Sequence, residues 1–133
     1  MSYPHLYFYH FLPLFNYFQR VFLTLGGLWS PRRILVDMIR HTVAFRLRHA
    51  AGSAAEAAFL ADAVRLGAIP GVQNFERLKQ VSAKNEFAFG FSMEFADREA
   101  YDIYNNHPVH TAFVAERWVP EVETFEETDY QPL

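Results

Sequence analysis

The amino-acid sequence predicts an α+β domain in which two strand–helix–strand units share one sheet. Three observations lead to this prediction. Segments 39–48 and 87–95 alternate apolar and polar residues with the period of a β-strand. Helix-start signals follow at Ser53 and Asp97. Turn residues then separate two further strand-like segments, so the elements follow the order β-α-β-β-α-β.

The first strand, 39–48, alternates strictly. Its inward positions are Ile39, His41, Val43, Phe45 and Leu47. A strand that is apolar on one side is half buried. His41 is the one polar member of this inward set, and a lone histidine on an apolar face is more often a hydrogen-bonded core residue than a catalyst.

The first helix begins with a capping box, in which Ser53 and Glu56 satisfy free backbone N–H groups. Apolar residues follow at helical spacing, and we expect Gly67 to close the helix. These residues are Phe59, Leu60, Ala63, Val64 and Leu66. The segment Ile69-Pro70-Gly71 predicts a turn, and 72–81 predicts the second strand.

The third strand, 87–95, has two unlike faces. One carries only large apolar residues, and the other carries Ala88, Gly90, Ser92 and Glu94. Small residues let another layer approach closely, so we expect this face to pack on something.

The last third of the chain predicts a helix over 98–105, a short helix starting at Pro108 and a final strand over 119–128. His107 is the expected cap of the short helix. The acidic residues near the end of the chain are typical of a solvated strand edge. The complete order is the split βαβ, or ferredoxin-like, arrangement, with helices on one face of the sheet.

Composition excludes several classes. A chain of 133 residues, 51% of them hydrophobic, suits one domain with a core. The absence of cysteine excludes disulfides and thiolate metal sites, and we expect a cytoplasmic protein. A net charge of −3 opposes nucleic-acid binding.

Residues 1–37 lack a clear period and are treated as an N-terminal extension, separate from a domain over 38–133. Segment 11–29 approaches the roughly 20 residues of a membrane span, but Arg20 near its middle opposes insertion. We expect no membrane role. The extension is either an added helix that packs on the domain or an upstream addition to a biological start at Met38, and we favour Met38.

Four segments, 39–45, 69–72, 91–97 and 101–110, resemble the stress-responsive A/B-barrel domain (Dabb) family, a branch of the dimeric α/β-barrel superfamily. The resemblance covers 38–130, and the His-Pro-x-His core of the last segment is its most specific part. It implies that two protomers pack their sheets face to face into a dimeric α/β barrel. The expected partner is therefore a second copy of the chain.

The resemblance also implies a pocket between sheet and helices. A plant polyketide cyclase of the family places a histidine, a tyrosine and a second histidine around such a pocket, and these fall on His41, Tyr104 and His110. His110 would act as a general base, Tyr104 would orient it or bind an enolate oxygen, and His41 would hold a second polar group. Tyr101 and Trp118 are expected to be core anchors.

Two functions stay open. The first is a small stress-response binding domain with a small-molecule pocket and no reaction. The second is a cofactor-independent cyclase or lyase acting on carbonyl or polyketide-like compounds through His110, Tyr104 and His41. An open pocket lined by all three side chains favours the enzyme, and a pocket filled by phenylalanine excludes it. The superfamily's haem-degrading monooxygenases rank third, because no haem pocket is visible in the sequence.

No cofactor is expected, although two metal hypotheses remain. Zinc would need His41 beside His107 and His110. Relatives imply magnesium on backbone carbonyls, which here fall on Leu66, Ile69 and Val72.

Overall fold

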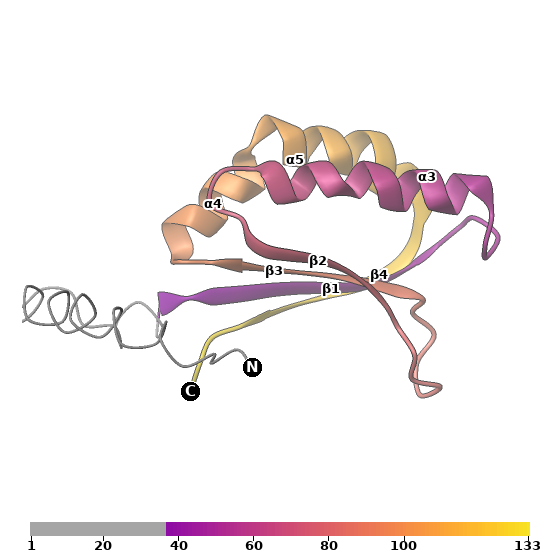
Figure 1. Ribbon diagram of the computed structural model, residues 1–133, viewed down its shortest axis with the longest axis horizontal. Coiled ribbons are helices and arrows are strands. Elements are labelled where there is room, and N and C mark those ends of the chain that lie inside the picture. Colours follow the sequence, from indigo (N-terminus) through magenta and orange to yellow (C-terminus); the bar gives the residue numbers. More distant parts are fainter. Residues whose placement is uncertain (1–36) are drawn as a thin grey trace, which may run out of the picture. The chain divides into compact units, whose positions relative to one another are not determined.

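The computed structural model describes residues 37–133, which form a sheet covered on one face by helices (Figure 1). The sheet is antiparallel with strand order β2-β3-β1-β4. Its strands are β1 (Ile39–Leu47), β2 (Gln73–Lys79), β3 (Phe89–Phe95) and β4 (Val122–Tyr130). The predicted α+β, ferredoxin-like arrangement is confirmed.

The helical layer contains two runs and a short helix between them. Its elements are α3 (Ala54–Asp62) with the 3₁₀ helix η1 (Ala63–Ala68), then α4 (Arg98–Asn106), then α5 (Pro108–Phe113) with the π-helix η2 (Val114–Trp118) and α6 (Val119–Glu121). The predicted caps are confirmed: Ser53, Asp97 and His107 each accept a backbone N–H near the start of their helix. Within residues 37–133 no helix has the length and apolar character of a membrane span. The predictions for segment 11–29 and for the upstream extension fall outside the described residues.

Three local predictions were wrong. The final strand begins at Val122 instead of residue 119, because the helix continues through a π-helical turn, which shifts the spacing of apolar residues. Val64 is exposed, because the helix tightens to 3₁₀ geometry at Ala63. Gly67 does not end the helix. A Cβ on it would lie 2.8 Å from Cδ1 of Phe75, so this glycine makes room for an aromatic ring.

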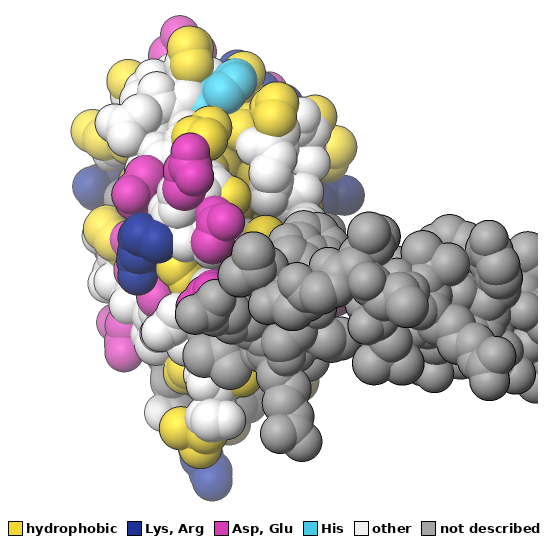
Figure 2. All heavy atoms as spheres, turned by 90° about the vertical axis from the view of Figure 1, so that its left-hand side faces the viewer, with side chains coloured by type: hydrophobic (Ala, Val, Ile, Leu, Met, Phe, Trp, Pro, Cys, Tyr) yellow, Lys and Arg dark blue, Asp and Glu magenta, His cyan; other side chains and the backbone are white. Residues whose placement is uncertain are grey.

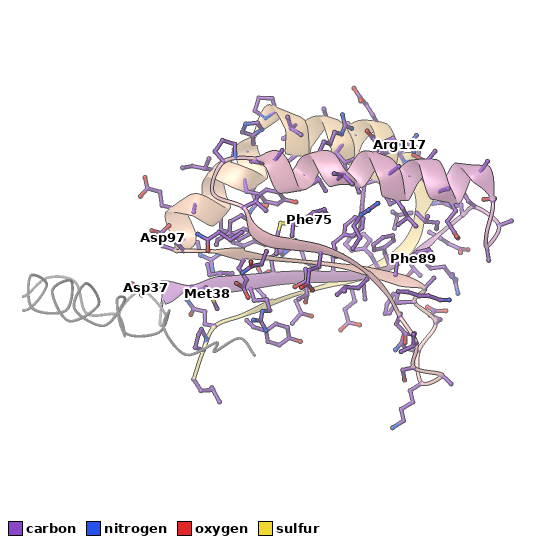
Figure 3. The ribbon with its side chains drawn as sticks, in the orientation of Figure 1. Asp37, Met38, Phe75, Phe89, Asp97 and Arg117 are labelled. Carbon is purple, nitrogen blue, oxygen red and sulfur yellow. The ribbon has the colours of Figure 1, made fainter. Side chains whose placement is uncertain are left out.

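The core lies between sheet and helices, where the apolar faces of β1 and β3 meet α3 and α5. Phe45 is completely buried, and its ring centroid lies 4.7 Å from that of Phe91 and 5.7 Å from that of Phe59. Figure 3 shows Phe75 in the same layer. Among the described residues, His41 is the only buried polar side chain of this core. All predicted inward positions of β1 are buried.

Within residues 37–133, no helix covers the opposite face of the sheet (Figure 1). Small and polar residues occupy its centre, where Thr42 pairs with Ser92 and Ala44 pairs with Gly90. Ion pairs flank this centre: Arg40 with Glu94 at 2.7 Å, and Arg46 with Glu86 and Glu123 at 2.9 Å. We call this surface the open face.

Candidate active site

A cavity of about 340 Å³ lies beneath the helices, and His41, Tyr104 and His110 all line it. Most of its wall is aromatic or aliphatic, from Phe91, Met93, Phe113, Trp118 and Phe125 among others. The phenylalanines therefore border the space without filling it. The three side chains predicted to form a site meet at one cavity.

The break between α4 and α5 brings Tyr104 and His110 together. Tyr104 ends the buried side of α4, and Pro108 starts α5 so that His110 returns beside it, with ring centroids 4.4 Å apart. His110 Nδ1 lies 3.0 Å from the Asn105 carbonyl oxygen. A carbonyl only accepts, so Nδ1 carries the hydrogen and Nε2 of the neutral ring is free to take a proton.

The two residues differ in how burial acts on them. Burial lowers the pKa of His110, with a further lowering from His41 and an opposing effect of the Asn105 carbonyl. Burial, reinforced by the charge of Glu127, raises the pKa of the Tyr104 hydroxyl. Near neutral pH the site therefore offers an unprotonated imidazole beside a protonated phenol, which is a base next to a hydrogen-bond donor.

His41 is held by residues that sequence reasoning did not assign to the site. Its Nδ1 lies 2.7 Å from Oδ1 of Asp129 and 2.9 Å from the Tyr101 hydroxyl. The carboxylate only accepts, so Nδ1–H donates to Asp129. The Tyr101 hydroxyl donates to the carboxylates of Asp129 and Glu127, at 3.0 and 3.3 Å. Nε2 of His41 makes no hydrogen bond within residues 37–133.

The expectation for Tyr101 was incomplete. It is a core anchor, with its ring 4.9 Å from that of Phe95, and its hydroxyl also reaches the site. The acidic end of the chain is more than a solvated edge, because Glu127 and Asp129 point to the helix-covered side of β4. One signal was available: alternation from Phe125 places Glu127 and Asp129 on the same side of the strand.

The zinc and the magnesium hypotheses have different outcomes. His107 Nδ1 accepts the Val109 N–H, and the described structure does not gather His107 with His41 and His110 at metal-ligand spacing. The magnesium site remains a prediction. The carbonyls of Leu66 and Ile69 already accept hydrogen bonds from within the turn, so a cation held there would share those oxygens.

The family described as Stress responsive A/B Barrel Domain matches residues 39–132. The chain belongs to this family. It is similar to a Dabb family protein with a ferredoxin-like fold from Mesorhizobium loti, at 61% identity and a TM-score of 0.71 over 72% of this chain and 97% of that one.

More distant structures share the fold alone. One is a dimeric ferredoxin-like protein of unknown function from Thermobifida fusca, at 18% identity and a TM-score of 0.63 over 80% of this chain and 97% of that one. Another is a hydroxynitrile lyase from Passiflora edulis, at 16% identity and a TM-score of 0.65 over 74% of this chain and 95% of that one. No curated protein matches the chain.

Proposed function

We propose that the protein is a cytoplasmic homodimer in which each protomer binds a small carbonyl compound in the cavity beneath its helices. The observation that carries this proposal is the cavity itself, which combines an aromatic wall with His41, Tyr104 and His110. Ligand pockets are mostly apolar, with a few polar groups that orient the ligand. The cavity suits a compound with one aromatic or aliphatic body and one or two oxygen atoms.

The open face supports the homodimer. It has small residues at its centre, and structural neighbours from Thermobifida fusca and Bacteroides fragilis are described as dimeric. A second copy packed on this face would bury Ala44 and Gly90 and complete a barrel of two sheets. The cavity lies on the other side of the sheet, so pairing leaves it accessible.

A second function, proton transfer next to a carbonyl, is favoured by the pairing of base and donor. His110 Nε2 would remove a proton from the carbon beside the carbonyl, and the electron pair would move onto the carbonyl oxygen. The Tyr104 hydroxyl would donate a hydrogen bond to the resulting enolate oxygen. Return of the proton from His110 to carbon completes the cycle without a cofactor. The Passiflora edulis lyase shares the fold, which makes a lyase-type outcome of this chemistry worth testing.

Deuterium exchange tests both functions. Acetophenone and acetylacetone, incubated with the protein in D₂O, should gain deuterium beside the carbonyl faster than without protein, as followed by NMR. His110→Ala should lower the protein-dependent rate by about 10²- to 10⁴-fold, the usual contribution of a general base. Tyr104→Phe should also lower it, since the enolate loses its donor.

His49→Ala is the matched control. His49 also bonds a carboxylate, Glu121, at 2.7 Å, yet it does not line the cavity. Its exchange rate should equal that of the unaltered protein. If ligands broaden or shift in NMR without exchange, the protein binds and does not catalyse. If neither ligand binds, the cavity is not a carbonyl site and both functions fail.

A further inference from the structure

We propose that His41, Glu127 and Asp129 bind a divalent transition-metal cation of the Zn²⁺ type at the edge of the cavity. This proposal goes beyond the function above and does not depend on it. The three side chains offer one imidazole nitrogen and two carboxylate oxygens, all within 4.8 Å of one another. The chain has no cysteine and therefore no thiolate ligand, and the three ligand atoms make a site of the nitrogen–oxygen type.

The ligand spacing suits a cation. His41 Nδ1 lies 2.7 Å from Oδ1 of Asp129 and 3.7 Å from Oε1 of Glu127. Ligands bonded at about 2.0–2.1 Å to a tetrahedral Zn²⁺ lie roughly 3.3 Å apart, between these two values. To admit the ion, His41 Nδ1 and Asp129 Oδ1 would separate by about 0.6 Å, and Glu127 Oε1 would approach Nδ1 by about 0.4 Å. The metal would take the place of the hydrogen on Nδ1.

Two adjacent strands hold the ligands in this arrangement. His41 on β1 pairs with Asp129 on β4, and Val43, two residues along, pairs with Glu127. Both carboxylates therefore leave the edge strand on the side of the imidazole, from backbone positions that the sheet fixes. Ligands carried by strands are positioned better than ligands carried by loops.

The charge of the cluster is the observation that decides in favour of a cation. Every other carboxylate that forms an ion pair within residues 37–133 has an arginine partner. Glu127 and Asp129 have His41 alone. A protonated His41 supplies one positive charge against two negative ones, whereas a divalent cation neutralises both.

The surroundings also suit a metal. Acidic side chains gather on the end of the molecule where the chain enters β1, and such a surface attracts cations (Figure 2). The Tyr101 hydroxyl donates to both carboxylates and would orient them, as outer hydrogen bonds do around protein-bound metals. Glu127 is half exposed and also lines the cavity. This leaves a path for the ion and an open position for water or for a ligand in the cavity.

Cobalt titration of the untagged full-length chain tests the proposal, because Co²⁺ in a nitrogen–oxygen site absorbs visible light and Zn²⁺ should displace it. We expect one such Co²⁺ per chain. Glu127→Gln and Asp129→Asn keep side-chain shape and remove one ligand charge each, and each should weaken binding at least about tenfold. Tyr101→Phe should weaken it about 10- to 100-fold, as loss of an outer hydrogen bond does.

Glu121→Gln is the matched control, since it removes the carboxylate from a second histidine–carboxylate pair of the described residues, His49 with Glu121. Its affinity for Co²⁺ should be unchanged. Circular dichroism establishes that each variant is folded. Glu127 is half exposed, so Glu127→Gln should not disturb the fold. Binding weaker than about 1 mM would overturn the proposal. Equal weakening by Glu121→Gln would do the same.

A titration with Mg²⁺ separates this site from the backbone carbonyls of Leu66, Ile69 and Val72, because a hard cation prefers all-oxygen ligands. Cation binding that persists in both carboxylate variants would place the ion elsewhere and refute the proposal. The carbonyl function is judged separately by deuterium exchange. Metal binding without exchange removes the proton-transfer function alone, and exchange without metal binding removes this metal site alone.

Discussion

The carboxylates on the two faces of the sheet have different basic partners. On the open face, Arg40 pairs with Glu94, and Arg46 pairs with both Glu86 and Glu123. On the helix-covered face, Glu127 and Asp129 share one histidine and have no arginine partner among the described residues. The same strand, β1, supplies the basic residue in each case, through alternate positions.

We interpret this difference as a division of roles, in which the open face serves dimerisation and the helix-covered face serves ligand binding. On the open face, arginine–carboxylate pairs flank a small-residue centre, and such a surface is suited to a second copy of itself. An uncompensated acidic pair beside a buried imidazole and a cavity is suited to a cation, a proton or a ligand. Three changes test this division, and the first two follow from opposite faces.

Gly90→Arg should have the largest effect, because it places a long cation at the centre of the open face, opposite Ala44. Burying an unpaired charge in an interface costs several kcal/mol. We expect the proposed dimer to dissociate and the protomers to lose much of their fold, as measured by analytical ultracentrifugation and circular dichroism.

Gly90→Ala is the matched control for this substitution. A Cβ at this position would lie 3.4 Å from the Val43 carbonyl oxygen, at the edge of ordinary van der Waals contact, so alanine should be tolerated. A Gly90→Arg chain that sediments as an intact dimer would show that the second copy does not use this face.

The fold was largely predictable because alternation in β1 and β3 is strict, and a period of two assigns every residue to one face. The faces of Phe45 and Gly90 follow directly from it. The π-helical turn before Val119 was not predictable, because it depends on tertiary packing. Trp118 lies 5.1 Å from Phe45 and 5.5 Å from Phe125, between ring centroids, and local sequence does not encode these contacts.

The site was predictable in part. His41, Tyr104 and His110 came from the resemblance and the inward side of β1, and the cavity brings them together. Asp129 escaped because its role depends on strand register: it lies opposite His41, which precedes it by 88 residues. When two paired strands are this far apart in the sequence, neither segment alone indicates their register.

The second test concerns His110 on the covered face. Its pKa is lowered in the folded protein, chiefly by burial, from the ordinary value of 6.5. As pH falls below 6.5, the unfolded chain takes up this proton before the folded one does, so stability falls with pH. The slope is about 1.4 kcal/mol per pH unit at most, and partial exposure reduces it.

His110→Gln should flatten this part of the stability curve. Urea unfolding of both proteins from about pH 7.5 to about pH 5 provides the measurement, and the other titrating groups cancel in the difference. Parallel curves over the whole range would mean that His110 titrates as freely in the folded protein as in the unfolded chain. The base proposed above would then lack its buried environment.

The smallest effect is expected from Arg40→Gln, a substitution on the open face. Hydrogen bonds from Arg40 and then from Asn74 lower the pKa of Glu94. The stabilisation is therefore present above the ordinary value of 4.5 and is lost as pH falls through the folded value.

Arg40 is half exposed in the single chain, so an isolated protomer should lose at most about 1 kcal/mol. The difference in urea midpoint between variant and original should be largest near neutral pH and should shrink as pH falls below 4.5. A loss of about 3–5 kcal/mol at neutral pH would instead show that a second copy covers and desolvates the pair, which would place Arg40 and Glu94 inside the dimer interface rather than around it.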